Sequence, residues 1–174
     1  MINFINSIID SIEQKNWYGA LFVSLAMPDI CGKIEFPDTH SSDRYPNWFK
    51  KYLSPYFKNE FKLEIVNEYE IIITQTSDFE YLLGKELYGL RCDCLHEGKN
   101  CVKDRKGNYQ REDIEKVIFT TKEVLEIYNS DKKTVTFNIE VFCNNVIRAV
   151  CDWLDEIKDD PIKAKKLNSL IEIH

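Results

Sequence analysis

The stretch that decides the fold class is NIEVFCNNVIRAVCDWLDEI, residues 138–157. Its apolar side chains recur every three or four residues: Ile139, Phe142, Val146, Val150, Trp153, Leu154 and Ile157. This spacing is typical of a helix with one apolar face, because an α-helix turns once in about 3.6 residues. Asn138 is well placed to cap the first turn. We therefore predict a long helix that packs against other helices.

The N-terminal segment shows the same periodicity. Apolar residues recur at helical spacing from Phe4 to Leu25. Proline lacks the N–H that an inner helical turn needs, so Pro28 should kink or end this helix near Ala26. We predict one helix over this segment.

Two further helices are predicted in the middle of the chain. Pro46 fits the first turn of a helix, with an aromatic face from Trp48 to Leu53. Ser77 and Glu80 have the spacing of a capping box, which predicts another helix. Gly98 is suited to the end of that helical stretch.

Strand formers gather in three places. Val117 to Thr120 and Thr134 to Phe137 are rich in β-branched and aromatic residues and predict a hairpin. Phe61 to Thr74 is ambiguous, and its isoleucines favour a strand. We predict a mainly α fold, a helical bundle of about four long helices with a small β-hairpin insertion. No repeat or Gly/Ser linker divides the chain, so we expect residues 1–174 to form one domain.

Composition restricts the classes of protein. Hydrophobic residues make up 44% and charged residues 30% of the chain, as in soluble globular proteins. The net charge of −6 disfavours a protein that wraps DNA nonspecifically. The apolar run from Trp17 to Met27 is shorter than a membrane span of about 20 residues and is not preceded by a basic region. We expect a cytoplasmic protein with no membrane partner, whose six cysteines are free thiols.

The segment that carries chemistry is LRCDCLHEG, residues 90–98. Arg91 is permanently charged and suits phosphate oxygens, whereas His96 titrates near neutral pH and can exchange a proton. Together they suit the cleavage of a phosphodiester without a metal or another cofactor. In a straight helix the two side chains diverge by about 140°, so we expect a bend that brings them into one cleft.

This segment resembles a known signature. Arg91 and His96, with Leu90, Leu95 and Gly98 around them, resemble the R-x4-6-H motif of the HEPN superfamily, which often reads LRN-x-x-x-HG. Members are small helical proteins that commonly dimerise and so bring two motifs into one cleft. Many are metal-independent ribonucleases of toxin–antitoxin, abortive-infection or CRISPR systems. The resemblance implies a homodimeric endoribonuclease with Arg91 and His96 as the catalytic pair, and an antitoxin or defence-system protein as partner.

Residues beside the motif are candidates for RNA binding. The loop from Lys99 to Arg111 has five basic residues against one acidic residue and directly follows His96. Basic side chains hold a nucleic-acid backbone, and an aromatic ring stacks on a base. The predicted substrate-binding residues are Asp93, Lys99, Lys103, Arg105 and Tyr109.

Two alternatives use the same neighbourhood. Cys92, Cys94, His96 and Cys101 could supply zinc ligands, although this spacing is unusual and Cys92 and Cys94 point about 200° apart on a helix. Active HEPN members often carry a polar residue directly after the arginine, where this chain has Cys92. That departure and the acidic charge favour the second alternative, a non-catalytic helical interaction or scaffold domain in which Arg91 pairs with a carboxylate such as Glu97.

Overall fold

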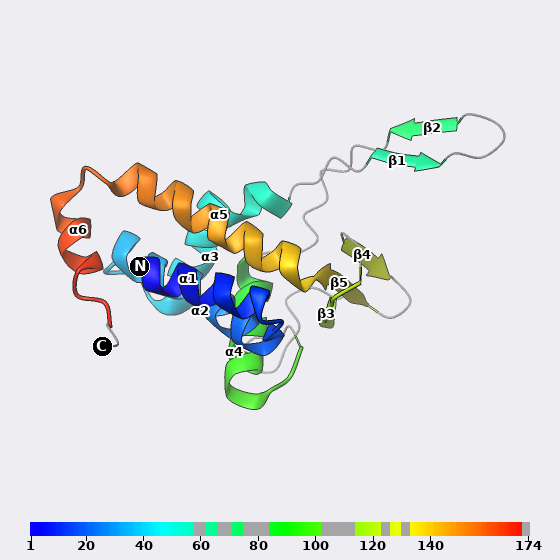
Figure 1. Ribbon diagram of the computed structural model, residues 1–174, viewed down its shortest axis with the longest axis horizontal. Helices are drawn as coiled ribbons and strands as arrows, with labels where there is room; N and C mark the ends of the chain where they lie inside the picture. The colour runs from blue at the N-terminus through cyan, green and yellow to red at the C-terminus, as the bar shows by residue number, and fades with distance from the viewer. Residues whose placement is uncertain are drawn as a thin grey trace.

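The computed structural model describes residues 1–57, 62–65, 71–74, 84–101, 114–122, 126–129 and 133–171. Within these ranges the chain forms six α-helices, two short helical turns of other types and five short strands (Figure 1). The α-helices are α1 (Ile2–Glu13), α2 (Trp17–Glu35), α3 (Ser41–Trp48), α4 (Gly84–Glu97), α5 (Ile139–Ile157) and α6 (Pro161–Leu167). A π-helical turn (Phe49–Leu53) and a 3-10 turn (Ser54–Phe57) follow α3. The strands are β1 (Lys62–Ile65), β2 (Ile71–Thr74), β3 (Lys116–Thr120), β4 (Glu126–Asn129) and β5 (Thr134–Asn138).

The mainly α fold is confirmed, and its core is built on α2 and α5. The apolar face predicted for residues 138–157 is buried, with Phe142, Val146 and Trp153 among its members. Asn138 caps α5 as predicted, because its side-chain oxygen accepts the Val141 N–H at 3.0 Å. The buried side chains of α1 to α5, β3 and β5 form one continuous core. Two short helices, α3 and α6, are present in addition to the about four long helices that were predicted.

The prediction of one helix from Phe4 to Leu25 is wrong, and Pro28 does not end the helix that contains it. The break lies between α1 and α2, where Lys15 adopts a φ of 55° and the Asn16 side chain accepts the Gly19 N–H at 3.1 Å. Pro28 lies inside α2. The hydroxyl of Tyr45 donates to the Leu25 carbonyl at 3.0 Å, so packing on α3 satisfies a carbonyl next to the proline turn. Tertiary packing therefore outweighs the local preference.

The position of Pro46 was also predicted wrongly. It lies in the second turn of α3, which begins at Ser41 with His40 as its cap. The helix predicted to begin at Ser77 is described only from Gly84, and its capping box lies outside the described residues. Its end is confirmed, because α4 stops at Glu97 and Gly98 takes a φ of 65°.

The predicted hairpin between Val117–Thr120 and Thr134–Phe137 is wrong, because β3 and β5 pair in parallel. Val117 lies opposite Val135, and β4 pairs with β5 in the antiparallel direction, which gives the order β3-β5-β4. Strand propensity marks a strand but not its partner, and the sequence reading missed β4. In the ambiguous segment, β1 and β2 are strands and pair antiparallel, as its isoleucines favoured.

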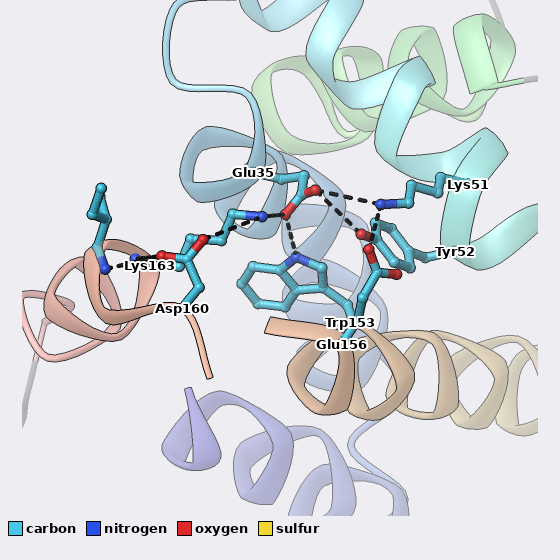
Figure 2. Close-up of polar contacts among 8 residues, drawn as sticks. Glu35, Lys51, Tyr52, Trp153, Glu156, Asp160 and Lys163 are labelled. Carbon is cyan, nitrogen blue, oxygen red and sulfur yellow. Dashed lines mark hydrogen bonds and ion pairs between the residues drawn. The ribbon is translucent and has the colours of Figure 1, made fainter. Parts of the chain in front are cut away.

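A buried carboxylate ties α6 to the rest of the fold (Figure 2). The Glu35 side chain, at the end of α2, is only 8% exposed. One of its oxygens accepts Trp153 Nε1 at 3.0 Å and Lys163 Nζ at 2.6 Å. The other accepts the Tyr52 hydroxyl at 3.3 Å and Lys51 Nζ at 3.5 Å. Glu35 thus joins α2, α5, α6 and the π-helical turn.

These donors control the ionisation of Glu35. Burial alone would raise the pKa of its carboxyl group, but the hydrogen bonds from Lys163 and Trp153, together with the charges of Lys163 and Lys51, outweigh burial, and the pKa is lowered. The carboxylate is therefore held in its charged form.

In the described part of the chain, no helix has the length and apolar character that crossing a bilayer requires.

Candidate functional site around Arg91 and His96

Arg91 belongs to a cluster in which two arginines share one carboxylate. Asp29 on α2 accepts Arg91 Nη2 of α4 at 3.1 Å on one oxygen. Its other oxygen accepts Nε and Nη2 of Arg44 on α3, at 3.0 and 2.9 Å. The side chains of Asp29, Arg44 and Arg91 are 16%, 17% and 21% exposed. The cluster is therefore half-buried at the junction of three helices.

Close helix packing brings these three residues together. Gly32 lies one turn after Asp29, and a Cβ at this glycine would lie 3.2 Å from the Arg44 carbonyl oxygen. A larger residue would push α3 away from α2, so Gly32 permits the approach of Arg44 to Asp29. On the other side, the rings of Tyr45 and Tyr88 meet edge to face at 5.5 Å. This contact docks α4 on α3 one turn before Arg91.

The cluster keeps a net positive charge and unused donors. Two guanidinium groups face one carboxylate, so the charge that remains is positive. Among the described residues, the Nε of Arg91 is buried without a hydrogen-bond partner, and its Nη1 contacts only the Cys92 sulfur at 3.9 Å. A guanidinium offers five N–H donors, so Arg91 has capacity for a further acceptor.

A buried tyrosine lies against this cluster. Burial raises the pKa of Tyr45 well above its usual value, while the nearby charge of Arg91 acts in the opposite direction. The hydroxyl therefore stays protonated and holds the Leu25 carbonyl. Tyr45 supports the position of Arg91 and does not itself supply a proton acceptor.

His96 lies apart from Arg91 within one chain. Helix α4 is continuous from Gly84 to Glu97, so the bend expected between the two residues is absent. The two side chains then diverge by about 140° around the helix. His96 is exposed, and it forms no hydrogen bond or ion pair with the other residues that the structure describes. The structure does not bring the predicted pair into one cleft of a single chain.

The other predicted site residues are distributed as follows. Asp93 is half-buried, and its backbone carbonyl accepts the Lys99 N–H at 3.1 Å. Lys99 also forms an exposed ion pair with Glu97 at 2.6 Å, which raises the pKa of the lysine. Glu97 therefore holds Lys99, and the carboxylate paired with Arg91 is Asp29. The predicted RNA contacts Lys103, Arg105 and Tyr109 lie outside the described residues.

The cysteines near the motif do not gather as metal ligands. Cys92, Cys94 and Cys101 are half-buried free thiols. In the part of the chain that is described, no three histidine, cysteine or acidic side chains are placed to hold a metal ion. The zinc alternative thus gains no geometric support, because Cys92 and Cys94 point to different sides of a continuous helix.

Helix α4 also borders a largely apolar cavity of about 590 Å³. Cys94 lines it together with Tyr18 and Phe22 of α2 and Ile118 and Phe119 of β3. The Tyr18 side chain is 76% exposed. Aromatic surface of this kind is common where a protein binds a partner.

Sequence reasoning missed Asp29 and Arg44. A signal for Asp29 was present, since it is the first charged residue after Trp17 and follows a largely apolar part of the helix. A charge in such a run needs a partner when it is buried. Nothing local identified Arg44 as that partner, because the two residues lie on different helices.

Comparisons with known proteins give no relative for this chain. No protein-family model matches it, and neither a curated protein nor a solved structure does.

Proposed function

We propose that this protein is a metal-independent endoribonuclease of the HEPN type, with Arg91 and His96 as its catalytic pair. The observation that carries the proposal is the state of Arg91. Asp29 fixes its guanidinium, yet the Nη1 donors have no oxygen acceptor among the described residues, and the cluster with Arg44 stays positively charged. A fixed cation with free donors suits the phosphate of an RNA backbone.

The chemistry follows from the two side chains. Arg91 binds the scissile phosphate and stabilises the negative charge that develops on its oxygens. His96 accepts the proton of the 2′-hydroxyl or donates a proton to the leaving oxygen, and water takes up or supplies the other proton. The 2′-oxygen forms a bond to phosphorus as the bond to the 5′-oxygen breaks. The products are a 2′,3′-cyclic phosphate and a 5′-hydroxyl, and DNA lacks the nucleophile for this step.

A second copy of the chain completes the site in this proposal. Arg91 and His96 diverge by about 140° on one continuous helix, so Arg91 of one copy acts with His96 of the other. A two-fold homodimer then contains two equivalent composite sites. We place this dimer in the cytoplasm, with an antitoxin or defence-system protein as its partner.

The direct test is cleavage of mixed RNA in the presence of EDTA. Wild-type protein should cleave, and Arg91→Ala and His96→Ala should each lose the activity. Arg148→Ala removes an exposed arginine of α5, and His40→Asn removes an imidazole while it keeps an acceptor for the α3 cap. These two controls should retain cleavage. Full activity in both the Arg91 and His96 variants would end the catalytic proposal.

Mixing the two inactive variants tests the composite site. Each mixed dimer pairs the intact Arg91 of one chain with the intact His96 of the other, so one of its two sites is complete. Equal amounts, once subunits have exchanged, should give about a quarter of wild-type activity in a two-fold dimer. If the pair acts within one chain, the mixture should stay inactive.

The second candidate is a non-catalytic interaction domain. Two observations favour it: Arg91 already has a structural ion-pair partner in Asp29, and aromatic residues including Tyr18 line an open apolar cavity. In this case wild-type protein should leave RNA intact with and without EDTA. Binding to a protein partner should weaken in Tyr18→Ser, which alters an exposed ring.

A further inference from the structure

We propose that Arg44 and Arg91 together form a phosphate-binding site, in which Asp29 orients both guanidinium groups. Arg44 then positions an RNA phosphate beside the proposed catalytic pair. The inference rests on the proposed function for the identity of the ligand as RNA. The binding step itself does not require cleavage.

The hydrogen bonds of the cluster leave guanidinium donors for an oxyanion. Arg44 Nη1 has only a long contact of 3.4 Å to the Thr39 carbonyl. Arg91 contributes Nη1, which has no oxygen acceptor among the described residues, whereas its Nε is buried. Asp29 has already used both oxygens on the two arginines. A phosphate can accept from two guanidinium groups at once. It would also neutralise the positive charge that the single carboxylate of Asp29 does not balance.

Two hydroxyl groups lie on the same helix faces. Ser41 precedes Arg44 by three residues on α3, and Tyr88 precedes Arg91 by three on α4, so each pair shares one face. The Ser41 and Tyr88 hydroxyl oxygens are 3.2 Å apart, and so these faces are directed toward one another. Both arginines are about one-fifth exposed, which leaves an edge of each within reach of solvent.

The test measures binding of a fully 2′-O-methylated RNA oligonucleotide, which lacks the nucleophile for cleavage, over a range of salt concentrations. For a single strand, the slope of log K against log salt should become smaller by about 0.7 for each phosphate that the protein no longer neutralises. Arg44→Ala should therefore bind about tenfold more weakly and with a slope smaller by about this amount. Arg148→Ala makes the same change in charge on exposed α5 and should alter neither quantity.

A second variant, Arg44→Lys, tests the same site if Arg44→Ala does not fold. It keeps the positive charge opposite Asp29 but loses the planar fork, so binding should lie between wild type and the alanine variant. Circular dichroism and thermal unfolding establish that each variant is folded. The inference is overturned if wild-type protein does not bind, if folded Arg44 variants bind as wild type does, or if Arg148→Ala has an equal effect.

The outcome for this site is separate from the outcome for catalysis. Arg44-dependent binding of the methylated oligonucleotide without cleavage of ordinary RNA would retain the phosphate site and reject the nuclease. Cleavage that depends on Arg91 and His96, with binding unaffected in Arg44 variants, would retain the nuclease and reject the phosphate site.

Discussion

Asp29 and Arg91 lie 62 positions apart in the sequence and meet at 3.1 Å between Oδ2 and Nη2. This ion pair joins α2 to α4 and gives the motif arginine a fixed position. Because Arg44 uses the other oxygen of Asp29, the same carboxylate also joins α3. Arg91 is thus part of the framework of the fold as well as a candidate for chemistry.

Asp29→Asn should destabilise the fold. Arg44 and Arg91 would lose their shared counter-charge and repel one another, so we expect the free energy of unfolding to fall by about 1–3 kcal/mol, less than for a fully buried pair. Urea denaturation measures this. Sulfate should stabilise the variant more than wild type at equal ionic strength, because an anion can replace the carboxylate. Asp159→Asn, which alters an exposed carboxylate, is the matched control; equal losses in the two variants would contradict the role of Asp29.

Glu35→Gln should lower stability at neutral pH. A neutral amide cannot replace the charged acceptor of Lys163 and Trp153, and we expect a loss of about 1–3 kcal/mol in urea denaturation. Lys163→Met should also destabilise, whereas Lys165→Met, on the exposed side of α6, should not. Similar effects of the two lysine substitutions would argue against the Glu35 contact.

The pH dependence of this contact has a definite sign. The pKa of Glu35 is lowered in the folded state from an ordinary value of 4.5. Its contribution is therefore fully present above that ordinary value and is lost as the pH falls through the lower folded pKa. The stability difference between wild type and Glu35→Gln should shrink in that acidic range. A difference that stays constant down to the acid transition would contradict the pKa shift.

Thiol labelling should separate the cysteines by burial. Burial raises the pKa of Cys31 well above its usual value and that of Cys143 to about 11. Both thiols should resist iodoacetamide until the protein unfolds, since the thiolate is the reactive form. Exposed Cys151 should be labelled in the folded protein. Peptide mass spectrometry with and without urea gives the comparison, and early labelling of Cys31 would indicate that α2 opens locally.

Asn138→Ala should remove the cap of α5. The side chain accepts the Val141 N–H at 3.0 Å and donates to the Lys122 carbonyl at 2.8 Å. Loss of such a cap costs about 0.5–2 kcal/mol. Asn138→Asp keeps the capping oxygen and loses only the donor, so its thermal unfolding temperature should lie between those of wild type and the alanine variant. Equal unfolding temperatures for the two variants would show that the cap contributes little.

Local signals predicted the elements that local physics controls. The periodicity of residues 138–157 predicted α5 and its buried face, and the lone Gly98 predicted the end of α4. Pro28 was expected to kink or end its helix, but α2 continues through it, and the neighbouring Leu25 carbonyl accepts from Tyr45 of α3, a long-range contact that local sequence does not display. Likewise, β-branched residues identified β3 and β5 but gave no information on their parallel pairing.

The candidate site was predictable only in part. Arg91 and His96 were proposed from their residue types and spacing and stay a prediction, while the contacts of Asp29 and Arg44 depend on how three helices pack. The bend expected between Arg91 and His96 rested on the helix end near Gly98, but α4 remains regular up to Glu97. A motif of this kind gives the residue types, and the geometry between them depends on the fold and on any second copy.

The contact between Glu35 and Lys163 also sets an order of events during synthesis. The two residues are 128 positions apart, and α6 has no fully buried side chain of its own. A nascent chain cannot close this contact until Lys163 has left the ribosome. Until then the Glu35 carboxylate lacks its nearest cation and stays hydrated. Completion of this corner of the fold is therefore a late step, and a product terminated before Lys163 would never reach it.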